Sequence, residues 1–489
     1  MKHKIFIFLL MVFTICAVAQ QMRVKPGTKI TITSGNTLDV SAGNLVLESD
    51  ISGDASFLNR GSITFTGGGQ ANVERYIGAW SGDDHGWHLL SSPIASQNIQ
   101  PEFVSDPPAT TQDFYKWDEV SGYWINSKLE NGNWNPAFDE TFTPGAGYLV
   151  AYSEDVTKNF TGVLNNDDMV RNGLTYTLSS LATGWHLLGN PYPCPLQWNL
   201  TTGGAGWNLS NIDGVSKIWS EVNASYSDIN QGDIVPAMQG FMVHISAEGS
   251  GSLTIPASDR THATESWFKA DPVNKITLIA YDTQGKTAQE CILQCKSDAT
   301  AGFDTRYDSR FLKGYAPQFY ALAGDEYLST NTLPEFNEFL VIDMGFVKNS
   351  SGEFTIEAEG LNSLLPNQNV FLKDIKLNYT QDLHQNPLYH FTALEGDNPL
   401  RFKLLFAEEE QAWSADNIRV FQAYGNLEVH FGKPMDANVQ VYNITGQLVL
   451  SKAVYQQSSC SLNMQTATGT YVVVVRTPEI IESKKVILF

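Results

Sequence analysis

A short pattern that occurs twice limits the folds open to the middle of this 489-residue chain. The segment Gly86-Trp-His-Leu-Leu-Ser-Ser-Pro93 recurs 98 positions later as Gly184-Trp-His-Leu-Leu-Gly-Asn-Pro191. A Lys/Trp segment and a segment with proline, glycine and an aromatic residue follow each copy in the same order, at 116–119 and 143–150, then at 217–221 and 234–243. Because three similar segments do not fall in one order by chance, we predict two copies of one β unit, over residues 79–165 and 166–257.

Each copy predicts a strand that ends at a proline-containing turn. Trp87 and Leu89 alternate with His88 and Leu90, as the two faces of a strand require. The tryptophan and histidine side chains either fill a core or form a ligand-binding edge that both copies repeat. The pattern also leaves open whether the copies are separate sandwiches or build one composite sandwich.

Residues 20–78 predict short strands separated by glycine turns. Ser34-Gly-Asn36 and Ala42-Gly-Asn44 lie eight positions apart, and the apolar residues between such turns alternate as in half-buried strands. The segment is either a small meander or a few rungs of a β-solenoid. The regular spacing favours the solenoid.

Residues 258–412 predict an antiparallel β-sandwich. Ile276–Ala280 and Cys291–Leu293 form a hairpin around the turn at 283–285, and further strands are expected at 354–357, 369–372 and 401–406. Cys291 and Cys295 lie in one strand with Cα atoms ~13 Å apart, too far for a disulfide. We therefore expect no disulfide framework, and the whole chain to be all-β and multidomain.

The N-terminus predicts an export signal. Lys2 and Lys4 precede an apolar run that ends at Ala17-Val-Ala19, which is typical of a secretory signal peptide over residues 1–19. Its removal takes the formal net charge from −21 to −23. A chain this acidic repels phosphate backbones, so nucleic acid is not an expected partner. No later apolar run reaches the ~18 residues of a membrane helix, so the mature chain is expected to have no transmembrane segment.

Residues 413–489 predict a small β-sandwich of immunoglobulin-like type that runs to the end of the chain. We expect Val439 and Val441 to share a core with Leu448 and Leu450, on either side of the turn Asn443-Ile-Thr-Gly446. The composition of 471–475 is that of a central strand. One interpretation of such a domain is that it only stabilises the end of a longer chain.

Three ordered motifs give this module a family resemblance: Val441-Tyr-Asn-Ile-Thr-Gly446, Gly469-Thr-Tyr-Val-Val-Val-Val475 and Lys484-Lys-Val-Ile487. Together they resemble the type IX secretion C-terminal sorting domain of exported Bacteroidota proteins, although the Asn-Pro pair that usually opens that family is absent here. The residues that carry the motifs are Tyr442, Gly446, Gly469, Tyr471, Lys484 and Lys485. The resemblance implies passage through the outer membrane by the type IX secretion machinery, and a final place outside the cell or on the outer-membrane surface. The duplicated unit also resembles repeat modules of large surface proteins from the same bacteria.

Aromatic residues in the first copy are candidates for glycan contact. Tyr123, Trp124 and Trp134 lie in polar, glycine-containing surroundings, and flat rings pack against the apolar faces of sugars. The alternative is that the same rings fill a sandwich core.

A weaker pattern suggests a calcium ion, and otherwise no cofactor is expected. Asp228, Asn230 and Asp233 surround a glycine turn as in a fragment of a calcium loop, but the bidentate Glu of such loops is missing. Asx-turns and surface ion pairs are the alternative for these residues.

The sequence contains none of the H-E-x-x-H, G-x-S-x-G or phosphate-loop motifs, so no catalytic residue is assigned. We interpret the chain as a non-enzymatic surface or secreted protein that acts in adhesion or in glycan or matrix binding. Two alternatives remain: a secreted hydrolase whose carboxylate pair is not recognisable from spacing, and a purely structural surface protein.

Overall fold

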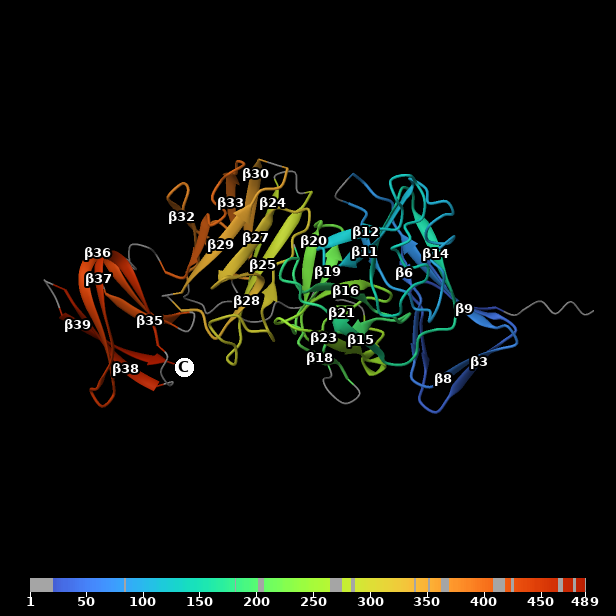
Figure 1. The fold of residues 1–489 in the computed structure, drawn as a ribbon, viewed down its shortest axis with the longest axis horizontal. Coiled ribbons are helices and arrows are strands. Elements are labelled where there is room, and N and C mark those ends of the chain that lie inside the picture. Colours follow the sequence, from blue (N-terminus) through green and yellow to red (C-terminus); the bar gives the residue numbers. More distant parts are fainter. Residues whose placement is uncertain are drawn as a thin grey trace, which may run out of the picture.

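The computed structural model is a row of β blocks that follows the order of the sequence (Figure 1). It describes residues 21–488 apart from 83–84, 181, 201–205, 264–274, 283–285, 338–339, 351, 362–368, 408–417, 424–425, 465–468 and 478–480. The expected signal peptide and the expected turn at 283–285 lie outside the described residues. Within them there is no α-helix, and the 3-10 turn η1 (Ala257–Asp259) is too short to change the fold class, so the all-β prediction is confirmed. No helix in this part of the chain is long and apolar enough to span a membrane.

The first block is wound from parallel strands. The parallel pairs are β1 (Met22–Val24) and β9 (Gln70–Ile77) on either side of β4 (Asn44–Leu47), β2 (Lys29–Ile32) with β7 (Ser56–Asn59), and β3 (Thr37–Ser41) with β8 (Ser62–Thr66). Thr37 lies opposite Ser62, 25 positions later. This is the pairing of a solenoid, because the strands of a meander are antiparallel. The eight residues between the glycine turns therefore form one side of a rung, and the strands that pair lie one full rung apart.

Two short elements and one long strand complete this block. β5 (Ser49–Asp50) and β6 (Gly53–Asp54) form a small antiparallel pair. β14 (Val156–Gly162) comes from the first sequence copy and pairs antiparallel with β9. The first copy is thus joined to the solenoid by a shared sheet.

The two sequence copies form four-stranded antiparallel sheets with the same strand order. The first runs β10 (His88–Leu90), β13 (Tyr148–Tyr152), β11 (Gln112–Asp118), β12 (Tyr123–Asn126), and the second runs β16 (Trp185–Gly189), β22 (Gly240–His244), β19 (Ser216–Ser220), β20 (Ser225–Ile229). The register agrees too, since His88 lies opposite Val150 and His186 opposite Val243. The second copy adds β15 (Met169–Leu174), β23 (Gly251–Ile255) and β18 (Asn208–Ser210) in one sheet, and the pair β17 (Leu196–Gln197) and β21 (Ile234–Val235).

The two copies contact each other through equivalent residues. Ser91 N donates to Met238 O at 2.8 Å, and its counterpart Gly189 N donates to Gly145 O at 3.1 Å. Gly145 (φ 74°) and Met238 (φ 57°) occupy equivalent positions and share the left-handed backbone conformation. Reciprocal contacts of this kind are those of a two-fold axis, so the copies build one composite unit.

Apolar side chains fill the space between the two sheets. Leu89 of the first copy packs with Leu187 and Met242 of the second, and Leu149 lies against them. Gly147 and Gly240 allow the sheets to approach closely, because a side chain at either position would collide with the facing leucine. The open question of separate or composite sandwiches is therefore answered in favour of the composite.

The third block is a single sheet of eleven strands. They are β24 (Lys275–Asp282), β25 (Ala288–Cys295), β26 (Ser309–Arg310), β27 (Gln318–Ala323), β28 (Glu326–Leu333), β29 (Val341–Val347), β30 (Glu353–Glu359), β31 (Phe371–Asp374), β32 (Tyr379–Asp382), β33 (Leu388–Thr392) and β34 (Phe402–Leu405). The prediction of an antiparallel sandwich needs two corrections. The strands belong to one continuous sheet, and β25 and β28 are parallel.

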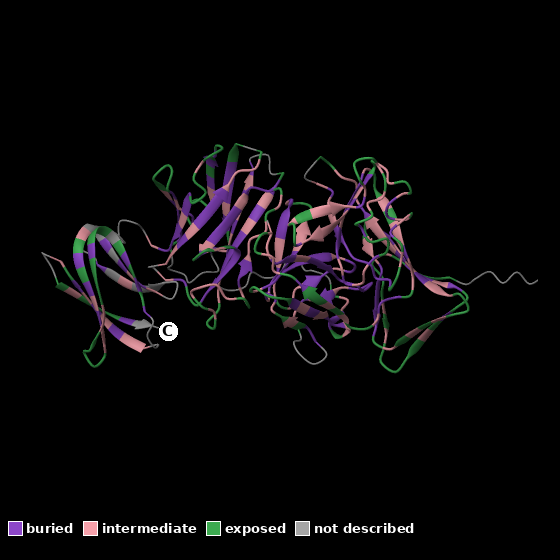
Figure 2. Cartoon of the chain, viewed as in Figure 1, coloured by how far each residue is buried: buried purple, intermediate pink, exposed green. Residues whose placement is uncertain are grey.

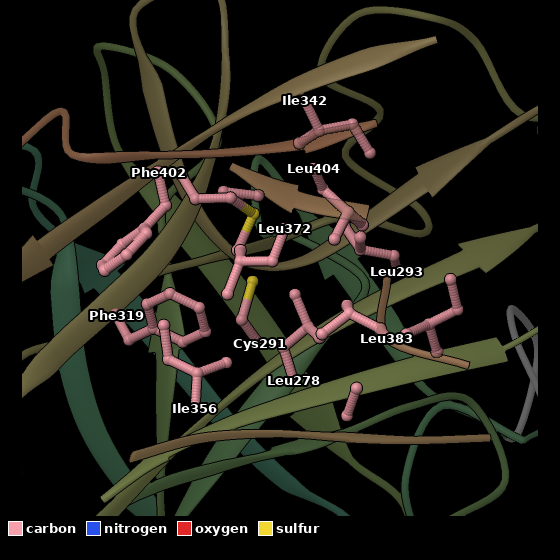
Figure 3. Packing of buried hydrophobic residues seen from close by; sticks show 14 of the residues in the cluster. Leu278, Cys291, Leu293, Phe319, Ile342, Ile356, Leu372, Leu383, Phe402 and Leu404 are labelled. Carbon is pink, nitrogen blue, oxygen red and sulfur yellow. The ribbon is translucent and has the colours of Figure 1, made fainter. Parts of the chain in front are cut away.

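This sheet folds over its own apolar face. Its end strands approach each other, since Gln381 Nε2 on β32 donates to Leu388 O on β33 at 2.9 Å. The enclosed core is continuous, and Figure 3 shows Cys291, Phe319 and Leu372 packed within it. Covering one face in this way removes the apolar surface of a large sheet from water.

The C-terminal module lies at the opposite end of the row from the solenoid (Figure 1). It is antiparallel and contains β35 (Arg419–Ala423), β36 (Asn426–Asn443), β37 (Leu448–Asn463), β38 (Gly469–Arg476) and β39 (Ile481–Leu488). Val439 and Val441 are fully buried, and buried positions alternate with exposed ones along its strands (Figure 2). The expectation for Leu448 is wrong: it is 48% exposed, because it follows the turn directly, whereas Leu450 is partly buried against the core.

Candidate functional site

Aromatic side chains from three parts of the chain meet where both copies adjoin the third block. Ring centroids lie 5.9 Å apart for Trp87 and Tyr115, 4.9 Å for Trp117 and Trp124, and 6.0 Å for Trp219 and Tyr315, all edge to face. We call these six residues the junction cluster. Tyr315 is 49% exposed, and the other five are half-buried.

Contacts across the junction fix these rings. Trp117 Nε1 donates to Trp185 O at 2.7 Å, and Tyr315 N donates to Ala224 O at 2.9 Å. Burial and the neighbouring Asp113 raise the pKa of Tyr115 to about 12, with a smaller contribution from Tyr315. The cluster is therefore held by both copies and by the third block.

The structure separates the three aromatic residues chosen from the sequence. Tyr123 and Trp124 are successive residues of β12 and point to opposite faces of the sheet. Tyr123 is 60% exposed, whereas Trp124 packs on Trp117 in the junction cluster. Trp134 packs edge to face on Phe138 and against the core shared with the solenoid. A single platform of all three rings is therefore not formed.

One buried carboxylate links the copies. The Oε atoms of Glu119 accept hydrogen bonds from Thr175 Oγ1 (2.6 Å), Thr177 N (2.7 Å), Thr177 Oγ1 (2.8 Å) and Gly184 N (2.8 Å). Burial alone raises the pKa of Glu119, but these hydrogen bonds outweigh it and lower the pKa to about 2. The equivalent Glu221 also contacts the other copy, since its Oε1 lies 2.5 Å from His88 Nδ1.

We expect Glu119→Ala to lower the free energy of unfolding by about 2–3 kcal/mol, because it leaves buried donors without an acceptor. Urea unfolding followed by tryptophan fluorescence measures this, since nine of the 11 tryptophans lie between residues 80 and 219. Because the pKa of Glu119 is lowered, the stability of the chain depends on pH. The ionised carboxylate contributes its full stabilisation above the ordinary pKa of 4.5, and this contribution is lost as the pH falls toward 2.

The equivalent position in the second copy provides the control. The side chain of Glu221 is 45% exposed, so Glu221→Ala should cost less than about 1 kcal/mol. Equal losses for the two variants, or a wild-type chain whose stability does not change between pH 5 and pH 2, would contradict this account of Glu119.

The residues of the suggested calcium loop have other neighbours. The side chain of Asp228 is buried, and Lys217 Nζ lies 2.5 Å from its Oδ1. Thr330 Oγ1 donates to its Oδ2 at 2.7 Å, and Ser329 Oγ donates to both oxygens. Asn230 N donates to Asp233 Oδ2 at 2.8 Å, as in a turn. No group of three metal-ligating side chains occurs in the described part of the chain, and calcium binding here stays a prediction.

Besides Lys217 and Asp228, a second set of ion pairs joins the second copy to the third block. Arg310 pairs with Asp213, and with Glu326 at 3.0 Å. His244 Nδ1 lies 3.1 Å from Asp213 Oδ2. Burial raises the pKa of Asp213, but His244 and Arg310 outweigh it and lower the pKa. Sequence reasoning missed these residues because the partners lie up to 97 positions apart.

The third block contains a cavity of about 360 Å³. It lies between the end of β29 and the turn after β33, and Phe346, Lys348, Ala393, Glu395, Asp397 and Arg401 are among the residues that line it. No sequence pattern indicated this site, because the two segments that form it are about fifty residues apart and neither has a recognisable motif.

The sorting motif residues surround the core of the C-terminal module. Gly446 (φ 79°) forms the turn between β36 and β37, where Asn443 Oδ1 accepts from Thr445 N and Gln447 N. Tyr471 is buried on β38, beside Gly469 at the start of that strand and opposite Asn443, the neighbour of half-buried Tyr442. Lys484 and Lys485 are exposed on β39, and Lys484 pairs with Glu482 at 2.8 Å.

Comparison with known proteins gives two family matches. The model of a domain of unknown function, DUF8693, matches residues 9–233 and 222–406, and the secretion system C-terminal sorting domain matches residues 423–488. No match was found among curated proteins. Among solved structures, a biofilm associated protein, BSP domain, is 9% identical with a TM-score of 0.16, over 85% of this chain and 95% of that one.

The sorting domain bears out the resemblance drawn from the three C-terminal motifs. It indicates export to the extracellular space or the outer-membrane surface, and an interaction with the type IX secretion machinery. The chain therefore belongs to the DUF8693 family and ends in a type IX secretion sorting domain.

Proposed function

We propose that the exported chain is a non-catalytic surface protein that binds glycans through the junction cluster. The observation that carries this proposal is that three aromatic pairs, from both copies and the third block, lie at one junction. Partly exposed rings that are already held edge to face lose little side-chain entropy when a ligand binds. Carbohydrate is the ligand class that such faces accept.

The charge of the chain favours an uncharged ligand over an anionic one. The chain is strongly acidic, with a formal net charge of −21, which disfavours phosphate polymers and anionic surfaces. Tyr123 is exposed on the opposite face of β12, outside the junction cluster, and is the alternative glycan contact that the same experiment tests. Calcium dependence is part of the same test.

A glycan array probed with the chain from Gln20 to Phe489, with and without calcium, tests the proposal. We expect binding that Tyr315→Ala or Trp124→Ala weakens about 30-fold, the effect of losing a central aromatic anchor. Tyr379→Ala is the matched control, because Tyr379 is 51% exposed on β32, outside the cluster. Urea midpoints equal to that of the wild type show that the variants remain folded.

Two outcomes would contradict the proposal. One is a folded chain that binds no glycan in either condition. The other is binding that the Tyr379 variant loses as much as the Tyr315 variant does. Loss of binding in Tyr123→Ala alone would move the site to the other face of β12.

A further inference from the structure

The cavity in the third block has the construction of a small-ligand site. Phe346, Ala393 and Arg401 are each less than 5% exposed and form its buried part. Arg401 is immobilised: its Nε and Nη2 donate to Asp374, with Nη2 to Oδ2 at 2.7 Å, and its Nη1 donates to Thr392 O at 2.7 Å. The floor is therefore rigid before any ligand arrives.

The turn on one side of the cavity is also fixed. Asp397 accepts from Lys376 Nζ at 2.8 and 2.7 Å and from Leu394 N at 2.9 Å. These bonds lower the pKa of Asp397, the largest effect coming from Lys376, so the carboxylate is ionised. Its position at the rim is set by the fold.

Two charged side chains that line the cavity, Lys348 and Glu395, are not held by such bonds. Lys348 follows β29 and Glu395 lies in the turn after β33, so they come from the two segments that enclose the cavity. Among the interactions of the described residues, neither side chain takes part in an ion pair or a hydrogen bond. A donor and an acceptor therefore remain available to a ligand on the lining of one cavity.

We propose that this cavity binds one or two units of a neutral sugar. The cationic Lys348 and Arg401 balance the anionic Glu395 and Asp397, so the lining favours no net ligand charge. Hydroxyl groups both donate and accept, and they satisfy an ammonium and a carboxylate together. A volume of about 360 Å³ is at the lower end of ligand pockets and excludes a folded partner.

This inference takes its ligand class from the proposed function but concerns a second, separate site. The cavity would hold a terminal sugar, while the junction cluster would contact a longer chain. The two sites share no residue, so variants of each can be tested independently.

Saturation-transfer NMR on the chain from Gln20 to Phe489 tests the proposal. The probes are glucose, galactose, N-acetylglucosamine, cellobiose and lactose, with glucuronic acid, glycine and glutamate as charged comparisons. We expect a neutral sugar to bind, and Lys348→Ala and Glu395→Gln each to weaken it at least tenfold, the effect of one lost hydrogen bond to a charged group. Lys313→Ala is the control, because Lys313 is exposed in the same block and does not line the cavity.

The result is decisive either way. Binding that is lost in both cavity variants and kept in Lys313→Ala and Tyr315→Ala supports the site. No binding of any neutral sugar, equal binding by both cavity variants and wild type, or preferential binding of glutamate, glycine or glucuronic acid overturns it. Loss in Tyr315→Ala with the cavity variants unaffected would overturn the cavity proposal and leave the junction cluster as the glycan site.

Discussion

Lys217→Met is expected to lower the free energy of unfolding of the repeat region by about 3–5 kcal/mol, because it leaves Asp228 buried without a counterion. Lys217 and Asp228 are 1% and 2% exposed, and they face each other across β19 and β20. Lys217 Nζ also donates to Ser309 Oγ at 2.9 Å and to Ser329 Oγ at 2.7 Å, both in the third block. The loss therefore weakens the contact between two blocks as well as one hairpin.

Burial lowers the pKa of Lys217, while Asp228 opposes this effect by favouring the charged ammonium. When one partner is removed, the free-energy cost of burying the other charge is no longer offset by the ion pair. The double variant Lys217→Met/Asp228→Leu removes both charges and should recover most of the stability. Urea unfolding by tryptophan fluorescence, with hydrogen exchange of β20 and β28, measures both effects.

The first copy contains the matched control. Lys116 pairs with Asp139 at 3.4 Å, but these side chains are 24% and 54% exposed. Lys116→Met should therefore cost less than about 1 kcal/mol. A Lys217→Met variant as stable as Lys116→Met, or a double variant no better than Lys217→Met, would contradict the view that a desolvated ion pair holds this junction.

The duplication of one β unit was predictable from the sequence because local patterns determine strands, and a repeated pattern repeats its pairing. The opposite directions of Tyr123 and Trp124 were also predictable, since successive residues of a strand alternate between faces. The glycan prediction rested on aromatic composition and not on strand direction. It therefore grouped as one site three rings that the fold separates.

Other features depend on contacts that no local pattern encodes. Asp228 looked like a turn residue, but Ser309, Ser329 and Thr330 reach it from 81 to 102 positions away. The third block was predicted as two sheets because alternating apolar residues indicate where single strands lie and not how a sheet folds over. The cavity arises only after that folding, so its residues carry no signal in the sequence.

Removing residues 423–489 is expected to stop the chain from reaching the cell surface and to leave it in the periplasm. The sorting domain occupies this segment, and its core depends on residues from all its longer strands, among them Val439, Val454 and Val473. Recognition by the secretion machinery requires that fold to present its surface. Fractionation of the native host, with protease digestion of intact cells, measures the surface fraction, which should fall at least tenfold.

Point variants separate the fold of the module from the surface that it presents. Tyr471→Ala removes a buried ring from the core and should reduce export through unfolding, at a cost of about 3–5 kcal/mol. Lys484→Ala/Lys485→Ala changes exposed charges and should leave the module folded. If the secretion machinery binds these two lysines, export falls while the free energy of unfolding does not. Lys452→Ala, which removes an exposed lysine on β37, should leave export and stability unchanged.

Surface display of the truncated chain at the wild-type level would contradict the role of the C-terminal module in export. It would mean that the passenger carries the export signal, and that the module is only a stable end to the row of β blocks.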